Sequence, residues 1–267
     1  MFGIIALFIL IVIIFGIIYI TLRNSGRMNK MYRKLFSLLK KNGFNIKEID
    51  QDEFKKITIY GIINFYPKGY IFDEIGIIST MTVNIGIMQM LTINFNPFEK
   101  DLYELNVDLI YIFNKRKFLF EFYNLILDKD NQKNKLFLTK INKINEKYLY
   151  LPNYKIIKGW LEPLIAALIS KIGISYQEEE LFNLYQEIIA TYIEYAKQMP
   201  KIKDDDLLRK NSLIKDFGNN LVNNGGVAID TFKKSIGVEK TKQFLGKVFF
   251  GYNIYNDLKM NKKYNYN

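Results

Sequence analysis

Asp108 is the residue whose setting first suggests chemistry, because it is a carboxylate inside the apolar run LYELNVDLIYIF at residues 102–113. If residues 105–113 form a strand, Asp108 points to the same side as Asn106 and Ile110. One interpretation is a sheet face that stays partly wet, where Asp108 caps a neighbour, pairs with a lysine or faces water. The other is a functional acid beneath a bound ligand.

Thr92 and Asn94 are polar residues of a second apolar run, IGIMQMLTINF at residues 85–95. Their spacing of two places both side chains on one face of a strand. Polar residues are common on a half-exposed strand, so a structural role and a ligand-binding role both stay open.

The residue types that are missing limit the chemistry. The 267 residues include no His and no Cys. Disulfides, Ser-His-Asp or Cys-His catalysis, the usual zinc sites and iron–sulfur clusters held by the chain's own thiolates are therefore excluded. Proton chemistry must use Asp, Glu, Tyr, Lys or water, and a redox reaction must take its electrons from outside the chain.

The elements that would position these residues change character along the chain. From about residue 45 to residue 128 the pattern is typical of strands joined by short turns, which predicts antiparallel hairpins. A helical pattern follows, and this order predicts an α+β domain in which helices flank an antiparallel sheet, an α/β/α sandwich. The strands are expected at residues 56–67, 75–83, 85–95, 105–113 and 117–127, with a turn at Pro67-Lys68-Gly69 and a further edge strand at 148–152.

The second half is predicted to be helical after a polar loop or weakly structured insertion at residues 128–146. Ser175 and Glu178 form the capping-box pattern that opens one of these helices. The tail at residues 257–267 is expected to be disordered. The predicted helices cover residues 156–172, 176–199, a stretch from Asp204 to about Leu221, 227–236 and 238–250.

Residues 2–22 carry no charge, and a helix of this length reaches ~30 Å, the thickness of a bilayer core. The following residues 23–41 hold seven basic residues and no acid. The positive-inside rule then predicts a single-pass membrane anchor, with the C-terminal domain in the cytoplasm. A cleaved signal peptide is the rival interpretation, but no basic start or small-residue cleavage site is evident.

The basic segment at residues 23–41 also has an apolar stripe at helical spacing, which includes Met28, Met31, Leu35 and Leu39. Such a helix can lie on the membrane or pack onto the following domain. Its basic residues either contact anionic headgroups or act only as a stop-transfer signal.

Two stretches resemble the ferredoxin-dependent bilin reductases. The first is INFNPFEKDLYELNVDLIYIF at residues 93–113, where that family has a Phe-Pro-like turn and then an apolar strand bearing an aspartate. The second, residues 184–250, is similar in order and spacing to the family's C-terminal helices and closes with Phe249-Phe250. Together the two stretches cover well under half of the chain. The family's fold, an antiparallel sheet between helical layers, agrees with the pattern of strands and helices described above.

The resemblance implies an open-chain tetrapyrrole bound between the sheet and the C-terminal helices. It implies single electrons from an external ferredoxin, an acidic protein partner, and no bound metal or flavin cofactor. Asp108 takes the position of the family's sheet aspartate, where burial would raise its pKa and let it donate a proton to the pigment.

The resemblance also implies substrate-binding positions. The sheet histidine of one subfamily falls near Leu91 or Thr92, and Asn94 lies close to a position where other subfamilies carry Asn. The family's C-terminal helix aspartate falls at Asn224–Gly226, where this chain has no carboxylate. Thr92, Asn94 and Asn224 are therefore the expected substrate-binding residues, with Asp108 as the catalytic acid.

Two functions are compatible with these observations. The leading one is a membrane-anchored cytoplasmic protein that binds or reduces a linear tetrapyrrole. The alternative is a non-enzymatic, membrane-anchored binding or scaffold protein with the same fold. The formal charge of +11 suits acidic partners such as the lipid bilayer or ferredoxin, but no basic and aromatic platform predicts nucleic-acid binding. The expected divisions are an anchor at 1–22, a basic linker helix at 23–41, the α+β domain at 42–256 and the tail at 257–267.

The predicted topology can be tested with protease. If residues 2–22 span the membrane and the domain is cytoplasmic, intact spheroplasts should protect residues 23–267 from added protease, and lysis should expose them. An immunoblot against a C-terminal tag reads the result. Digestion of that region from outside intact spheroplasts would contradict the predicted orientation.

Overall fold

The computed structural model describes residues 2–72, 74–154 and 159–255, and within them the chain forms one eight-stranded sheet. All neighbouring strands are antiparallel, in the order β1-β3-β4-β5-β6-β7-β8, and β2 pairs separately with β3. The strands are β1 (Ile46–Ile49), β2 (Ile57–Ile59), β3 (Ile63–Phe72), β4 (Gly76–Ile85), β5 (Met88–Asn96), β6 (Glu104–Ile112), β7 (Lys115–Tyr123) and β8 (Ile165–Ile174).

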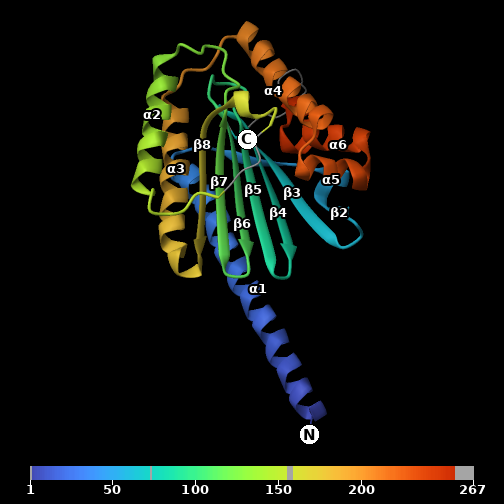
Figure 1. The fold of residues 1–267 in the computed structure, drawn as a ribbon. Coiled ribbons are helices and arrows are strands. Elements are labelled where there is room, and N and C mark those ends of the chain that lie inside the picture. The colour runs from blue at the N-terminus through green and yellow to red at the C-terminus, as the bar shows by residue number, and fades with distance from the viewer. Residues whose placement is uncertain (1, 73, 155–158, 256–267) are drawn as a thin grey trace.

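Helices lie on both faces of the sheet, which confirms the predicted α/β/α arrangement (Figure 1). Two buried apolar clusters, one on each face, hold the layers together. One cluster joins the sheet to α1 (Phe2–Lys41), α2 (Gln132–Lys147) and α3 (Glu178–Gln198). The other joins it to α4 (Asp204–Asn224), α5 (Val227–Ile236), α6 (Val238–Phe244) and the π-helix Leu245–Phe249.

The meander predicted between residues 75 and 127 is confirmed as β4, β5, β6 and β7. Alternation along β6 divides its side chains between the two faces. Leu105, Val107 and Leu109 are fully buried in the cluster with α1 and α3. Asp108 therefore points to the opposite face, toward α4–α6.

The single strand expected at residues 56–67 is wrong, because the chain turns after Ile59 and returns as the hairpin β2–β3. The turn expected at Pro67-Lys68-Gly69 is also wrong, since it lies inside β3. Pairing explains how a proline fits there: β2 pairs with residues 63–65 of β3 and β1 with residues 69–72. Pro67 falls between these two pairings, where its missing N–H is tolerated.

The helix expected at residues 156–172 is wrong. Residues 155–158 lie outside the described part of the chain, and Ile165–Ile174 form β8, which pairs with β7. The apolar residues of this segment fit helical spacing, but the open edge of β7 supplies partners for its backbone N–H and C=O groups. The edge strand expected at 148–152 is wrong as well, because β8 occupies that edge and residues 148–152 form turns and a bend.

The loop expected at residues 128–146 is also wrong, because most of it forms α2. The Asn131 side chain caps this helix by accepting a hydrogen bond from the Lys133 backbone N–H at 3.0 Å. A sparse apolar stripe then buries one face of the helix against α3 and the sheet. The stripe consists of Phe137, Ile141 and Ile144.

Helix α1 runs without a break through the boundary expected between anchor and linker. Side chains 5–19 are all exposed, and the helix is long and apolar enough to cross a membrane. The second half packs onto the domain, as one of the two sequence interpretations predicts. Its buried stripe consists of Asn24, Met28, Met31, Leu35 and Leu39.

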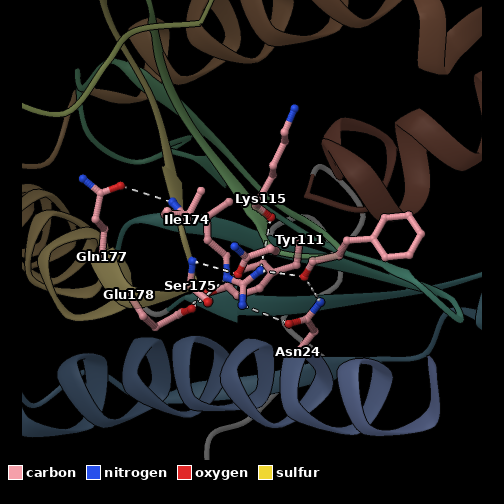
Figure 2. Close-up of polar contacts among 10 residues, drawn as sticks. Asn24, Tyr111, Lys115, Ile174, Ser175, Gln177 and Glu178 are labelled. Atoms are coloured by element: carbon pink, nitrogen blue, oxygen red, sulfur yellow. Dashed lines mark hydrogen bonds and ion pairs between the residues drawn. The ribbon is translucent and has the colours of Figure 1, made fainter. Parts of the chain in front are cut away.

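A fully buried arginine holds α1 to the sheet. Arg116 donates through Nε to Glu178 Oε2 at 2.7 Å and through Nη2 to Asn24 Oδ1 at 3.0 Å. The Tyr111 hydroxyl donates to the other Glu178 oxygen at 2.5 Å, and the Arg116 guanidinium lies 4.4 Å from the centre of the Tyr111 ring. Figure 2 shows Asn24 reaching from α1 toward Tyr111, with Glu178 approaching from α3. This cluster joins β6, β7, α3 and α1.

Glu178→Gln should destabilise the domain by about 3–5 kcal/mol, because it leaves the Arg116 guanidinium buried without a counter-ion. Glu179→Gln is the matched control, since the Glu179 side chain is 65% exposed and lies 3.6 Å from Lys30, so this variant should unfold like wild type. Urea unfolding of the full chain in detergent, followed by Trp160 fluorescence, measures both. Equal, small effects would mean that the fold does not depend on this pair.

Candidate functional site

The two faces of the sheet differ in character. The face covered by α4–α6 carries polar residues, whereas the opposite face is apolar. Glu104, Asn106 and Asp108 alternate along β6 and so point to the same side. Thr92 lies directly opposite Asp108 on β5, and Asn94 lies directly opposite Asn106. Pairing of β5 with β6 thus brings Thr92, Asn94 and Asp108 together.

A cavity of about 190 Å³ lies over these residues, and we call it the acidic pocket. Its floor is the polar part of β5–β7, and its other walls are apolar side chains of β3–β5, α4, α5 and the segment that ends the π-helix. It is lined by Phe65, Met81, Met90, Thr92, Asn94, Glu104, Asn106, Asp108, Tyr123, Phe217, Leu221, Ala228, Ile229, Phe249 and Phe250.

Asp108 is half-buried in the wall of this pocket. It accepts a hydrogen bond from Thr92 Oγ1 at 2.5 Å and a longer one from Asn106 Nδ2 at 3.5 Å. Burial raises the pKa of the Asp108 carboxyl, and the two hydrogen bonds only partly oppose the rise. Among the described residues, no lysine or arginine forms an ion pair with it.

Two further carboxyl groups lie on the same face of the sheet, Glu121 next to Asp108 and Glu104 next to Glu121. Glu121 of β7 is directly opposite Asn106 and accepts a hydrogen bond from its Nδ2 at 3.0 Å. Burial, and then the charge of Asp108, raise the pKa of Glu121 to about 7. Burial, and then the charge of Glu121, raise the pKa of Glu104 well above its usual value. Like charges this close resist ionising together, so the cluster retains protons near neutral pH.

Several buried oxygens on the pocket wall have no hydrogen-bond donor within the described part of the chain. They are Asn94 Oδ1, Asn106 Oδ1 and both carboxyl oxygens of Glu104. The amide NH₂ groups of the two asparagines are already used, since Asn94 donates to Asn96 Oδ1 and Asn106 to Glu121, both at 3.0 Å. The remaining asparagine oxygens are therefore free to accept from a ligand.

The wall opposite the floor is fixed by one backbone carbonyl. Phe249 O, at the end of the π-helix, accepts hydrogen bonds from the Ser79 hydroxyl at 2.6 Å and from Asn96 Nδ2 at 3.1 Å. Asn94 Nδ2 also lies within 3.5 Å of this oxygen. The sheet thus positions Phe249 and Phe250 over the pocket, and irregular π-helical turns of this kind are frequent at functional sites.

Asn224 does not join this group. It is the last residue of α4, its side chain is exposed, and it does not line the pocket. Its expected role in substrate binding stays a prediction. Glu104 and Glu121 were not predicted as site residues, although the alternation Glu104-Asn106-Asp108 is a usable signal. The approach of Glu121 depends on the pairing of β6 with β7 and has no local signal.

No family model and no curated protein matches this sequence. Among solved structures, the fold is similar to that of phytochromobilin synthase from tomato, in complex with biliverdin. The TM-score is 0.66, the sequence identity is 13%, and the similarity covers 85% of this chain and 84% of that chain. It supports the predicted fold class, an antiparallel sheet flanked by helices, and at this identity it establishes the fold alone.

The raised pKa of Glu121 makes a testable contribution to stability. A carboxyl whose pKa is about 7 when folded, against about 4.5 unfolded, holds its proton more tightly in the folded state. Stability is therefore lost as pH rises from about 4.5 to about 7. Glu121→Gln should remove this loss. The free energy of unfolding of the variant, relative to that of wild type, should therefore be about 2–3 kcal/mol higher at pH 8 than at pH 5.

Urea unfolding of the full chain in detergent at both pH values measures this difference. Glu53→Gln, at an exposed position outside the pocket, is the control and should show the wild-type pH dependence. If the free energy of unfolding changed with pH by the same amount in Glu121→Gln and in wild type, Glu121 would ionise freely in the folded protein.

Proposed function

We propose that this chain binds a linear tetrapyrrole in the acidic pocket and reduces it, with Asp108 as a proton donor. The proposal rests on the composition of the pocket wall, where a carboxyl group of raised pKa lies beside unpartnered oxygens and opposite apolar side chains of α4 and α5. The similarity of fold to a protein in complex with biliverdin supports the choice of pigment.

The unpartnered oxygens favour a ligand with several N–H donors. A linear tetrapyrrole presents N–H groups along one edge and apolar ring surfaces on either side. Donation to Asn94 Oδ1, Asn106 Oδ1 or Glu104 would relieve an unsatisfied buried group, which costs about 1–3 kcal/mol. Because no basic side chain lines the pocket among the described residues, a small anion is a poorer fit, and the propionate groups of a tetrapyrrole would lie outside the pocket.

The pocket would hold only part of such a pigment. Its volume of about 190 Å³ is below the ~300–1,000 Å³ of typical small-molecule sites. The remainder has a place on the same face of β6–β8, beside Asp108. There the apolar side chains of Ile110, Leu119, Leu168 and Ile172 are half-buried and available for contact with the rings.

The proposed reaction takes two electrons and two protons for each pigment double bond that is reduced. Electrons would arrive singly from an external ferredoxin, an acidic protein that suits a chain with a formal charge of +11. Asp108 would donate one proton. Glu121, whose pKa is about 7 and which shares the Asn106 amide donor with Asp108, would supply the other by way of water.

The proposed location is the cytoplasmic face of a membrane, with α1 as a single-pass anchor. The apolar first half of α1 has the length of a membrane span, and its basic continuation favours retention in the cytoplasm. Ferredoxin and pigment would then reach the domain from the same compartment.

Asp108→Asn should keep biliverdin binding, because the side-chain shape is preserved, and should lose turnover by about 10²–10⁴-fold because the proton source is gone. Binding is measured by the absorption spectrum of biliverdin mixed with the purified chain, and turnover in a ferredoxin-coupled assay. Asp216→Asn makes the same chemical change at an exposed position on α4 and should preserve both.

Each result bears on one part of the proposal. Unchanged turnover in Asp108→Asn would remove Asp108 from the mechanism. A wild-type chain that binds biliverdin but does not reduce it would favour a non-enzymatic pigment-binding protein. A wild-type chain that does not bind biliverdin would favour the scaffold alternative.

A further inference from the structure

Two chain turns contact α1 at the point where its apolar half ends, and a third adjoins them. The Thr21 hydroxyl donates to Gly86 O, in the β4–β5 turn, at 2.8 Å. Asn24 Nδ2 donates to Phe113 O, in the β6–β7 turn, at 3.1 Å. The β8–α3 turn adjoins the second of these, since Ser175 N–H donates to Asn114 Oδ1 at 3.3 Å. Figure 1 shows this end of the sheet facing the side from which α1 leaves the domain.

The register of β3 against β4 places a fourth turn, between β2 and β3, at the same end of the sheet. Strand β3 pairs with β4 from Phe65 opposite Val83, so the β2–β3 turn before Phe65 extends as far as Gly86 does. Ile62 in this turn is 77% exposed, and Tyr176 in the β8–α3 turn is 78% exposed. Apolar and tyrosine side chains of this kind are favoured at a membrane–water interface.

The acidic residues of the domain are also unequally distributed between the two ends of the sheet. The four turns span 59–63, 84–88, 112–116 and 174–178. Their only acid is Glu178, which is buried and paired with Arg116, and the exposed Glu179 that follows it lies 3.6 Å from Lys30. Other carboxylates lie at the opposite ends of the strands, in the connections after β3, β5 and β7. These are Glu74, Glu99, Asp128 and Asp130.

The end of the sheet that carries the four turns is rigidly connected to the apolar half of α1. No loop separates the apolar half of α1 from the docked half, because the helix is continuous from Phe2 to Lys41. The docked half is held by its buried stripe, by Arg116 through Asn24, and by the Tyr185 hydroxyl, which donates to Met31 O at 3.1 Å. If residues 2–22 span a bilayer, the turns that touch residues 21 and 24 must lie within about one helical turn of its surface.

We propose that the four-turn end of the sheet rests on the surface of the bilayer, in contact with anionic lipid headgroups. This inference depends on the membrane anchor proposed above but not on pigment binding. Ile62 and Tyr176 insert at the interface, and Lys115 with the exposed Arg27 faces the headgroups. The acidic pocket is thereby held at a set orientation to the membrane.

The absence of cysteine makes a direct test possible, because single-cysteine variants of the full chain can be labelled at one site. Ile62→Cys and Tyr176→Cys, carrying an environment-sensitive fluorophore, would be placed in nanodiscs that contain anionic lipid. Leu208→Cys and Leu136→Cys are matched controls, since both positions are exposed and lie near the starts of α4 and α2, at the far end of the domain (Figure 1). Val12→Cys is the control for the membrane span.

The proposal predicts blue-shifted emission and quenching by headgroup-proximal spin-labelled lipid at residues 62 and 176, and water-like emission without quenching at residues 136 and 208. Lipid-like emission at residue 12 with water-like emission at 62 and 176 would overturn the proposal and leave the anchor intact. Water-like emission at residue 12 would overturn both the membrane anchor and the contact of the four turns with the bilayer. None of these readings changes if biliverdin fails to bind, so the two proposals fail separately.

Discussion

The need to neutralise one buried charge shapes how the parts of this protein fit together. Arg116 has no exposed surface, and an unpaired guanidinium in such a place would cost several kcal/mol. Glu178 supplies the counter-ion from α3, and Asn24 supplies a further acceptor from α1. One side chain of β7 therefore joins the sheet to two helices that are far apart in sequence, and together with the buried stripe of α1 it sets the angle at which the apolar helix leaves the domain.

The second constraint is the asymmetry of the sheet. One face packs apolar side chains against α1, α2 and α3 and provides most of the core. The other face carries the desolvated carboxyl groups of Glu104, Asp108 and Glu121, an arrangement that costs stability unless these groups are protonated or bound. A buried group of this kind is more readily explained by a function than by folding.

The sequence patterns correctly predicted the elements that depend on local spacing of apolar residues. They failed for elements that depend on pairing or packing with distant parts of the chain. Strands β4–β7 and the position of Asp108 followed from alternation of period two. Strand β8 was mistaken for a helix because its edge pairing with β7 is invisible locally, and α2 was mistaken for a loop because only three large apolar residues mark its buried face. The same limit applies to the site: Asp108 and Thr92 could be predicted, whereas Glu121 reaches them only through the β6–β7 register.

Occupation of the acidic pocket by a linear tetrapyrrole can be read from the circular dichroism that biliverdin acquires when it is held in one conformation. Leu221→Trp would fill the pocket from α4, whereas Leu208→Trp places the same side chain at an exposed position of that helix. Wild type and Leu208→Trp should each show an induced signal with one pigment per chain, and Leu221→Trp should lose it. An equal signal in both variants, or none with wild type, would contradict occupation of the pocket.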